Sequence, residues 1–356
     1  MRLGIIGFPQ SGKTTIFNAL TRGDRPTTLS GGRFEVHTAV VDVPDRRVDR
    51  LADLFNPDKI TYAKVTYADI AGVDNGSGTK GFSGALLTQL TQMDGLLHVV
   101  RCFEDPSVPD SLGNLNPGRA ITKMDAELLL NDLIVVEGKL ERLFEEQRRS
   151  GSRDKAVIAR EIDLFQKLQS ALEDELPLRD LALTVSELKE LSSFGFLTLK
   201  PLLVVLNVGD EQSPPSISYP HQRSLVVDMQ GKLEMELVQL PAEEIDAFKA
   251  SYGIQELGLE RVIRLSYDLL GYQSFFTVGE DEVRAWRARR GATAHEAAGV
   301  IHTDLQKGFI RAEVIAHDEL LALGSLVEAR TRGRFRLEGK DYILCDGEIM
   351  HVRFNV

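Results

Sequence analysis

Four stretches of the chain are apolar almost without interruption, and each is bounded by glycine or by a polar turn. In chain order they are LGIIG, AKVTYADIAG, GLLHVVRCF and PLLVVLNVGD. Runs of this length and composition predict buried β-strands. After the first strand, Ile16, Phe17 and Leu20 follow at helical spacing. Near-continuous apolar strands that alternate with helices predict an α/β fold, in which a parallel sheet is covered on both faces.

Nearly a hundred residues separate the third strand from the fourth, which is too many for one crossover. From Lys123 to Leu191 the sequence is charged, and apolar residues recur at alternating spacings of four and three until RSGSRD breaks the pattern. This heptad seam predicts two antiparallel helices, inserted into the sheet domain, with a turn at Ser150-Gly151-Ser152. The seam residues are Leu129, Leu133, Val136, Leu140 and Leu143 before the turn, and Ile158, Ile162, Phe165, Leu168 and Leu172 after it.

Basic residues surround the predicted turn. A solvated helix end and an arm that contacts phosphate both fit this pattern. They are Arg148, Arg149, Arg153, Lys155 and Arg160.

The pattern of apolar and polar residues changes again from about Phe276. Apolar and polar residues alternate between glycine turns, which predicts short antiparallel strands, and ATAHEAAGVIH reads as one helix among them. The predicted organisation is therefore a sheet domain in two parts, residues 1–122 and 196–275. A helical hairpin arm is inserted over residues 123–195, and a small β domain covers residues 276–356.

The segment GFPQSGKT, which runs from Gly7 to Thr14, matches the phosphate-binding pattern G-x-x-x-x-G-K-[ST]. Glycines at these positions let successive backbone N–H groups point inward at phosphate oxygens, and the helix that follows adds its positive end. Lys13 can reach the β- and γ-phosphates, and the Thr14 hydroxyl can ligate Mg²⁺. A strand before the motif and a helix after it are the context that a P-loop requires. The nucleotide-binding candidates here are Gln10, Ser11, Gly12, Lys13, Thr14 and Thr15.

A second motif, DIAG, ends the second strand with Asp69 and Gly72. Phosphate-sensing enzymes place an acid there to hold Mg²⁺ through water, and a glycine whose N–H meets the γ-phosphate. The glycine-rich segment that follows fits a switch that the γ-phosphate orders, or an ordinary surface loop. Thr38 is the best candidate for the threonine that closes over the metal, with Thr15, Thr27 and Thr28 as competitors. The predicted catalytic residues are Lys13, Thr38 and Gly72, and the predicted metal ligands are Thr14, Thr38 and Asp69.

The fourth strand ends in Asn207-Val208-Gly209-Asp210, where guanine-nucleotide switches commonly carry N-K-x-D. The acid of that motif accepts hydrogen bonds from the guanine edge, and here Asp210 keeps the acid although the lysine is absent. Asn207, Val208 and Asp210 are therefore base-binding candidates, and an ordinary turn is the alternative. Val73 stands where many such proteins have the glutamine that orients the attacking water. Slow hydrolysis is expected, helped by backbone groups, the metal, a monovalent cation such as K⁺, or a partner.

Charge, apolar run lengths and cysteine content argue against DNA-binding, membrane and disulfide-rich secreted proteins. The net charge of −11 argues against non-specific electrostatic binding of nucleic acid by the whole chain, so we expect no DNA specificity. No apolar run approaches the ~20 residues that cross a bilayer, so no membrane association is expected. Two cysteines in 356 residues suit a reducing cytoplasm. Trp286 lies among four arginines and could stack on RNA or pack inside the β domain.

Taken together, these residues resemble the YchF / Obg-like ATPase family of P-loop GTPase-type proteins. The resemblance covers nearly the whole chain and includes GFPQSGKTTIFNALT, DIAG, HVVRCFED and LTLKPLLVVLNV. It is densest in GATAHEAAGVIHTDLQKGFIRAEVI and LEGKDYILCDGEIMHVRFNV, which look like the family's C-terminal TGS domain, a β-grasp module. The fold that it implies is a P-loop G-domain with an inserted coiled-coil arm and a C-terminal TGS domain.

The resemblance implies a cytoplasmic, Mg²⁺-dependent hydrolase of ATP or GTP that associates with ribosomal RNA or protein, through the arm and the TGS domain. Four segments depart from the family's pattern. Gln10-Ser11-Gly12 replaces an Asn-Val-Gly core, and GGRFEVH stands where the family has a longer switch segment before the threonine. Asp210 replaces a glutamate, and Gln230-Gly231-Lys232 stands at the family's S-A-K-like loop, which makes Gly231 a nucleotide-binding candidate. The family favours ATP, whereas aspartate is the acid that reads guanine. A nucleotide-sensing module with negligible turnover is the alternative function, and a small-molecule phosphotransferase is a third.

Overall fold

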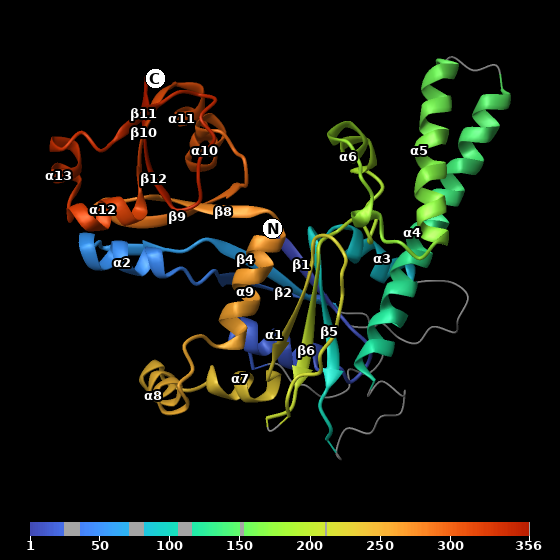
Figure 1. Cartoon of the computed structure of the whole chain (residues 1–356), viewed down its shortest axis with the longest axis horizontal. Helices are drawn as coiled ribbons and strands as arrows, with labels where there is room; N and C mark the ends of the chain where they lie inside the picture. The colour runs from blue at the N-terminus through green and yellow to red at the C-terminus, as the bar shows by residue number, and fades with distance from the viewer. Residues whose placement is uncertain (25–35, 71–81, 106–115, 150–152, 211, 356) are drawn as a thin grey trace. The chain divides into compact units, whose positions relative to one another are not determined.

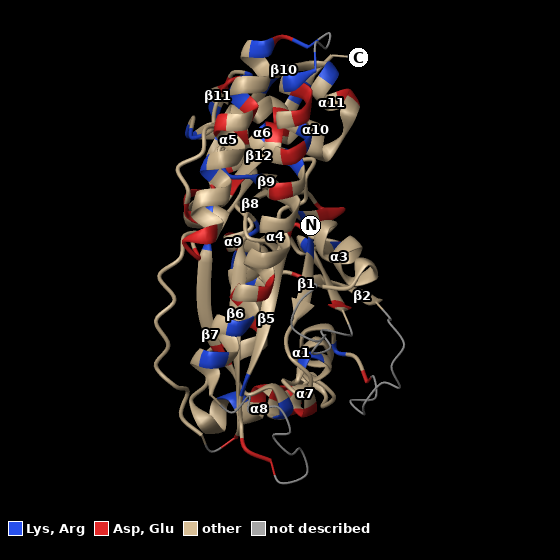
Figure 2. Cartoon of the chain, turned by 90° about the vertical axis from the view of Figure 1, so that its right-hand side faces the viewer, with Lys and Arg blue, Asp and Glu red and all other residues tan. Residues whose placement is uncertain are grey.

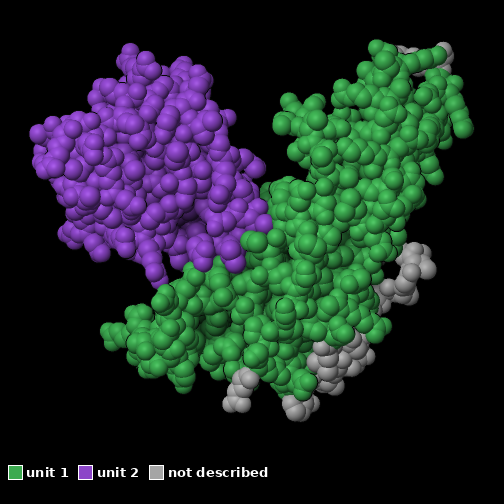
Figure 3. Space-filling model, viewed as in Figure 1, with its two compact units in different colours: residues 1–39, 66–262 green, residues 40–65, 263–356 purple. Residues whose placement is uncertain are grey.

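The computed structural model describes residues 1–24, 36–70, 82–105, 116–149, 153–210 and 212–355 (Figure 1). The chain forms two compact units, residues 1–39 with 66–262 and residues 40–65 with 263–356 (Figure 3). The domain boundaries predicted from the sequence stay a prediction. The contacts add one feature that the sequence did not indicate, because residues 40–65 belong with the C-terminal part of the chain.

The P-loop sheet has six strands in the order β2-β4-β1-β5-β6-β7. The pairings of β1 with β4 and β5, of β5 with β6, and of β6 with β7 are parallel, as the apolar runs predict. The strands are β1 (Arg2–Ile6), β2 (Val36–Asp42), β4 (Lys64–Ile70), β5 (Gly95–Cys102), β6 (Leu202–Val208) and β7 (Ser224–Met229). Parallel strands place their carboxyl ends at one edge of the sheet, where the loops of α/β proteins form ligand sites.

Helices follow the strands of this sheet. Side chains of α3 and of the first turns of α4 pack with β5 and β6 in one apolar core, while α1 packs against α7. The helices of this part are α1 (Lys13–Thr21), α3 (Gly84–Thr91), α6 (Val185–Leu191), α7 (Gly231–Leu237), α8 (Ala242–Tyr252) and α9 (Gly258–Leu269), with the short 3₁₀ helix η1 (Leu178–Asp180). No helix in the described ranges is long and apolar enough to span a membrane.

The predicted arm is present as the antiparallel pair α4 (Pro117–Arg148) and α5 (Lys155–Glu173), which extends from the sheet (Figure 1). All ten predicted seam residues lie in one apolar cluster, and nine of them are buried. The predicted turn at residues 150–152 lies outside the described residues. Close to the end of the arm, Arg153 pairs with Glu146 and Glu161, and Arg160 pairs with Glu190. Acidic and basic residues are therefore mixed there (Figure 2), which favours the solvated helix end over a purely basic tip.

The second unit contains a mixed six-stranded sheet in the order β11-β10-β12-β8-β9-β3, with α10 on its apolar face. Its strands are β3 (Lys59–Thr61), β8 (Tyr272–Thr277), β9 (Glu282–Arg289), β10 (Phe309–Ala316), β11 (Arg336–Glu338) and β12 (Glu348–Phe354). Its helices are α2 (Arg46–Phe55), α10 (Ala294–Ile301), α11 (Thr303–Lys307), α12 (His317–Leu323) and α13 (Leu326–Thr331). Trp286 packs beside this core and donates its indole N–H to Thr277, so the packed alternative holds.

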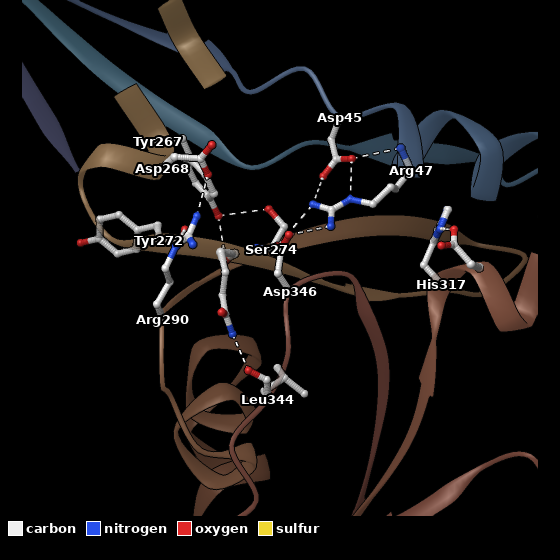
Figure 4. Close-up of polar contacts among 12 residues, drawn as sticks. Asp45, Arg47, Tyr267, Asp268, Tyr272, Ser274, Arg290, His317, Leu344 and Asp346 are labelled. Carbon is white, nitrogen blue, oxygen red and sulfur yellow. Dashed lines mark hydrogen bonds and ion pairs between the residues drawn. The ribbon is translucent and has the colours of Figure 1, made fainter. Parts of the chain in front are cut away.

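Arg47 ties the segment that carries α2 to this unit. Its guanidinium binds Asp45 and Asp346 and lies 5.2 Å from the centre of the Phe276 ring (Figure 4). Asp346 also accepts the N–H of Ser274 at 2.9 Å, so one carboxylate links α2 to β8. The two carboxylates fix the orientation of the planar guanidinium group of Arg47. Arg47 and Asp346, which form this contact, are 299 residues apart in the sequence.

Candidate functional site

The loop between β1 and α1 has the conformation of a phosphate cradle. Gly12 has φ 91° and Gln10 has φ 62°, both in the left-handed region. Glycine is required at position 12, because an added Cβ would overlap the amide nitrogen of Asn207. A non-glycine residue with positive φ is strained, and such strain gathers at functional loops. The loop therefore curls as the motif predicts.

Lys13 lies over this loop. Its Nζ donates to the carbonyl oxygens of Gly7 at 2.9 Å and Phe8 at 3.0 Å. The ammonium group therefore lies at the opening of the curved loop, beside the backbone that would surround phosphate oxygens. A phosphate in the cradle would meet a positive charge that the loop already positions.

Thr14 and Asp69 meet although 55 residues separate them. The Thr14 hydroxyl donates to Asp69 Oδ2 at 3.1 Å, and the Asp69 side chain is buried at the end of β4. The register of the sheet explains this contact, since Ile5 of β1 lies opposite Asp69. A hydroxyl beside a carboxylate supplies hard oxygen ligands, which suit Mg²⁺. Among the described residues, no group of three or more histidine, cysteine, aspartate or glutamate side chains is arranged to hold a metal ion by itself.

Asn207 links the cradle to the first residue of α7. Its side-chain amide donates to the Ser11 carbonyl at 3.0 Å, and its Oδ1 accepts the N–H of Gly231 at 3.2 Å. The residue is buried, so it acts as a brace between two loops. The sequence predicted Asn207 and Gly231 as nucleotide contacts, and the structure brings them together through this brace.

The other residues predicted to lie near the nucleotide base, Asp210 and Val208, differ in how exposed their side chains are. Asp210 is exposed, and its carbonyl accepts from the Gln230 amide at 2.8 Å, while Gln212 accepts the N–H of Gly209 at 3.3 Å. Val208 instead packs into the apolar core beside β5, so only its backbone faces the loop. The sequence analysis named Gln230 through the S-A-K-like loop but not Gln212, because a lone amide side chain in a loop carries no motif.

Two described residues that the sequence predicted for the site, Thr15 and Thr38, have no described contact with Thr14 or Asp69. Thr15 lies half-buried in the first turn of α1. Thr38 lies inside β2 with an exposed side chain, and no described contact joins it to Thr14 or Asp69. Gly72, Val73, Thr27 and Thr28 lie outside the described residues.

His98 is a buried residue of this region for which the sequence pattern gave no functional role, because the histidines show no metal-ligand spacing. It is fully buried in β5, and its two ring nitrogens have no hydrogen-bond partner among the described residues. Burial, with a smaller effect of the Lys13 charge, lowers the pKa of His98 to about 3, so the ring is neutral at physiological pH. A histidine in the middle of an apolar run was the available signal.

The fold and this cluster define a P-loop nucleotide-binding protein of the G-domain class. Residues 2–137 match a family model described as a 50S ribosome-binding GTPase, and residues 272–355 match the model of the YchF GTPase C-terminal domain, described as a protein of unknown function.

Relatives match the chain over its whole length. A protein named ribosome-binding ATPase YchF from Haemophilus ducreyi is 39% identical, over 100% of this chain and 99% of that protein. The protein of that name from Bacillus subtilis is 37% identical over 99% of each. The solved structure of the Schizosaccharomyces pombe YchF GTPase is 28% identical, with a TM-score of 0.84, and the match covers 99% of this chain and 97% of that one. The chain belongs to the YchF family.

Proposed function

We propose that this chain is a Mg²⁺-dependent purine nucleotide hydrolase that acts as a switch and associates with ribosomes. One observation carries the proposal: Lys13 is held at the mouth of the cradle while Thr14 and Asp69 meet at 3.1 Å beside it. These groups form a charge and a pair of oxygen ligands where a triphosphate and its metal would lie. Relatives named ribosome-binding ATPase support the same function.

The chain's own residues would then divide the work. Lys13 and the loop N–H groups bind phosphate oxygens, and Thr14 with Asp69 holds Mg²⁺, which neutralises charge on the phosphates when it is bound. Thr38 and Gly72 are proposed to sense the γ-phosphate from the two switch segments. Asp210 is proposed to read the purine. The arm and the C-terminal unit are the proposed ribosome contacts, with a monovalent cation as an aid to hydrolysis.

A single-turnover assay tests hydrolysis. Labelled ATP and GTP would be mixed with excess protein and Mg²⁺, with and without ribosomes and K⁺, and phosphate release followed. We expect slow release that ribosomes or K⁺ accelerate, because Val73 cannot orient the attacking water. Binding without release under every condition would instead favour a nucleotide-sensing module, the alternative that Val73 motivates.

Base preference depends on Asp210. Replacing it with alanine should weaken GTP binding by about tenfold and ATP binding by less, because only guanine offers the acid two N–H donors. A competition titration of ATP against GTP on both proteins measures the change. Equal loss for both nucleotides would contradict a base-reading role, and Asp246→Ala on α8 is the matched control.

A further inference from the structure

Glu234, in the first turn of α7, is a buried carboxylate that the proposed catalytic and binding roles do not use. Its side chain is 7% exposed, yet no cation pairs with it among the described ion pairs. Instead, one oxygen accepts the N–H of Gly258 at 2.9 Å and the other accepts the N–H of Leu259 at 2.6 Å. These are the first two residues of α9, so the carboxylate caps the positive end of that helix.

The contact is closely fitted. An added Cβ on Gly258 would overlap Glu234 Oε1, so glycine at this position leaves room for the carboxylate. The backbone N–H of Glu234 also bonds to the Gln230 carbonyl at 2.9 Å. Glu234 therefore holds α9 with its side chain and residue 230 with its backbone.

A continuous series of bonds runs from this carboxylate to the P-loop. Gly231 donates to Asn207, and Asn207 donates to the Ser11 carbonyl. The Gln230 side chain donates to the Asp210 carbonyl in the proposed base-reading loop. We propose that Glu234 is a positioning residue for the purine end of the nucleotide site, fixing the loop at residues 230–231 by anchoring α7 to the start of α9. The inference rests on the proposed function, and it identifies Glu234 as the residue that supports the part of the nucleotide site where the base would bind.

The protonation state of Glu234 should change this support near neutral pH. Burial raises its pKa to about 7, the two backbone bonds and Arg261 lower it, and Glu260 raises it. Glu234 lines a cavity of about 210 Å³. The charged groups around it are Asp228 on β7, Glu256 before α9, Arg261 and Glu260 on α9, and Lys249 of α8, which pairs with Glu260 at 3.5 Å.

The hydrogen bonds that Glu234 accepts determine the direction in which nucleotide affinity changes with pH. Above pH 7 the carboxylate is ionised and both oxygens accept N–H groups, so the loop at residues 230–231 is fully held. Below pH 7 one oxygen carries a proton, becomes a poorer acceptor, and the support weakens. Nucleotide affinity should therefore fall as the pH decreases from 8 to 6.

The test measures binding of fluorescent mant-ATP and mant-GTP, with Mg²⁺, to the full-length chain between pH 6 and 8. The wild type is compared with Glu234→Gln, and with Glu236→Gln as a control on the exposed face of the same helix. At pH 8, Glu234→Gln should bind the nucleotides about fivefold more weakly than the wild type, and at pH 6 the difference should shrink below twofold. Titration of the nucleotide's phosphates affects all three proteins equally, and thermal unfolding at both pH values checks that each is folded.

Inorganic tripolyphosphate, used as a competitor, separates positioning from general damage because it lacks a base. Its affinity should be the same in Glu234→Gln and the wild type. A parallel loss of tripolyphosphate binding, or a Glu234→Gln protein that keeps the wild-type pH profile, would overturn the inference and leave the proposed function standing. Failure of the wild type to bind either nucleotide at any pH would overturn the proposed function itself.

Discussion

Replacing Lys13 with alanine is expected to reduce affinity for ATP and GTP by about a hundredfold or more, while the protein stays folded. The ammonium group lies at the mouth of the cradle, held by two loop carbonyls, and it is the one lysine that the motif directs at the β- and γ-phosphates. Removing one partner of a buried, hydrogen-bonded charge pair typically costs several kcal/mol of binding. Isothermal titration calorimetry with Mg²⁺ and each nucleotide measures the loss.

The matched control is Lys155→Ala, an exposed lysine at the start of α5 in the arm. It removes the same charge from the chain without touching the cradle, so its nucleotide affinity should equal that of the wild type. If Lys13→Ala binds either nucleotide with wild-type affinity, the cradle is not the phosphate site, and the proposed function loses its main support.

Local features of the site could be predicted from the sequence. The P-loop motif consists of glycines and a lysine at fixed spacing within one strand–turn–helix segment, so it can be recognised without knowledge of any distant contact. The meeting of Thr14 with Asp69 could be expected for a related reason. Thr14 follows β1 and Asp69 lies at the carboxyl end of the parallel strand β4, and the carboxyl ends of parallel strands lie at one edge of the sheet.

Features that depend on distant packing could not be predicted. The role of Asn207 as a nucleotide contact stays a prediction, but its bonds to Ser11 and Gly231, which lie far from it in the sequence, were not expected. The role of Val208 at the same site also stays a prediction, and the structure adds that alternation along β6 places its side chain in the apolar core. Glu234 gave no signal, because a glutamate in a charged helix is ordinarily solvated.

The placement of residues 40–65 shows the same limit at the scale of a domain. β3 has only three residues and is too short to give a periodic pattern, yet it pairs in parallel with β9, more than two hundred residues away. Arg47 gave no signal either, since its partner Asp346 is nearly three hundred residues distant. The segment between the two proposed switches is consequently built into the C-terminal unit, so that unit is joined by the chain to both β2 and β4.

Asp132, in α4, fixes the root of the arm. Its carboxylate accepts the N–H of Leu197 at 2.8 Å, and the N–H and hydroxyl of Thr198 at 2.7 and 2.6 Å. The side chain is 2% exposed, and burial raises its pKa to about 6, so it is ionised and accepts all three bonds at pH 7.5. The arm is therefore held to the segment that leads into β6 by one buried group.

Replacing Asp132 with alanine is expected to lower the free energy of unfolding by about 3–5 kcal/mol, because it leaves three buried donors without an acceptor. Whole domains are stable by about 5–15 kcal/mol, so this loss is large enough to show directly in urea denaturation at pH 7.5. Asp132→Asn keeps one acceptor oxygen and should lose less. Asp163→Ala, on the exposed face of α5, is the control and should change the unfolding midpoint little. A midpoint for Asp132→Ala equal to that of this control would mean that the three bonds do not hold the root of the arm.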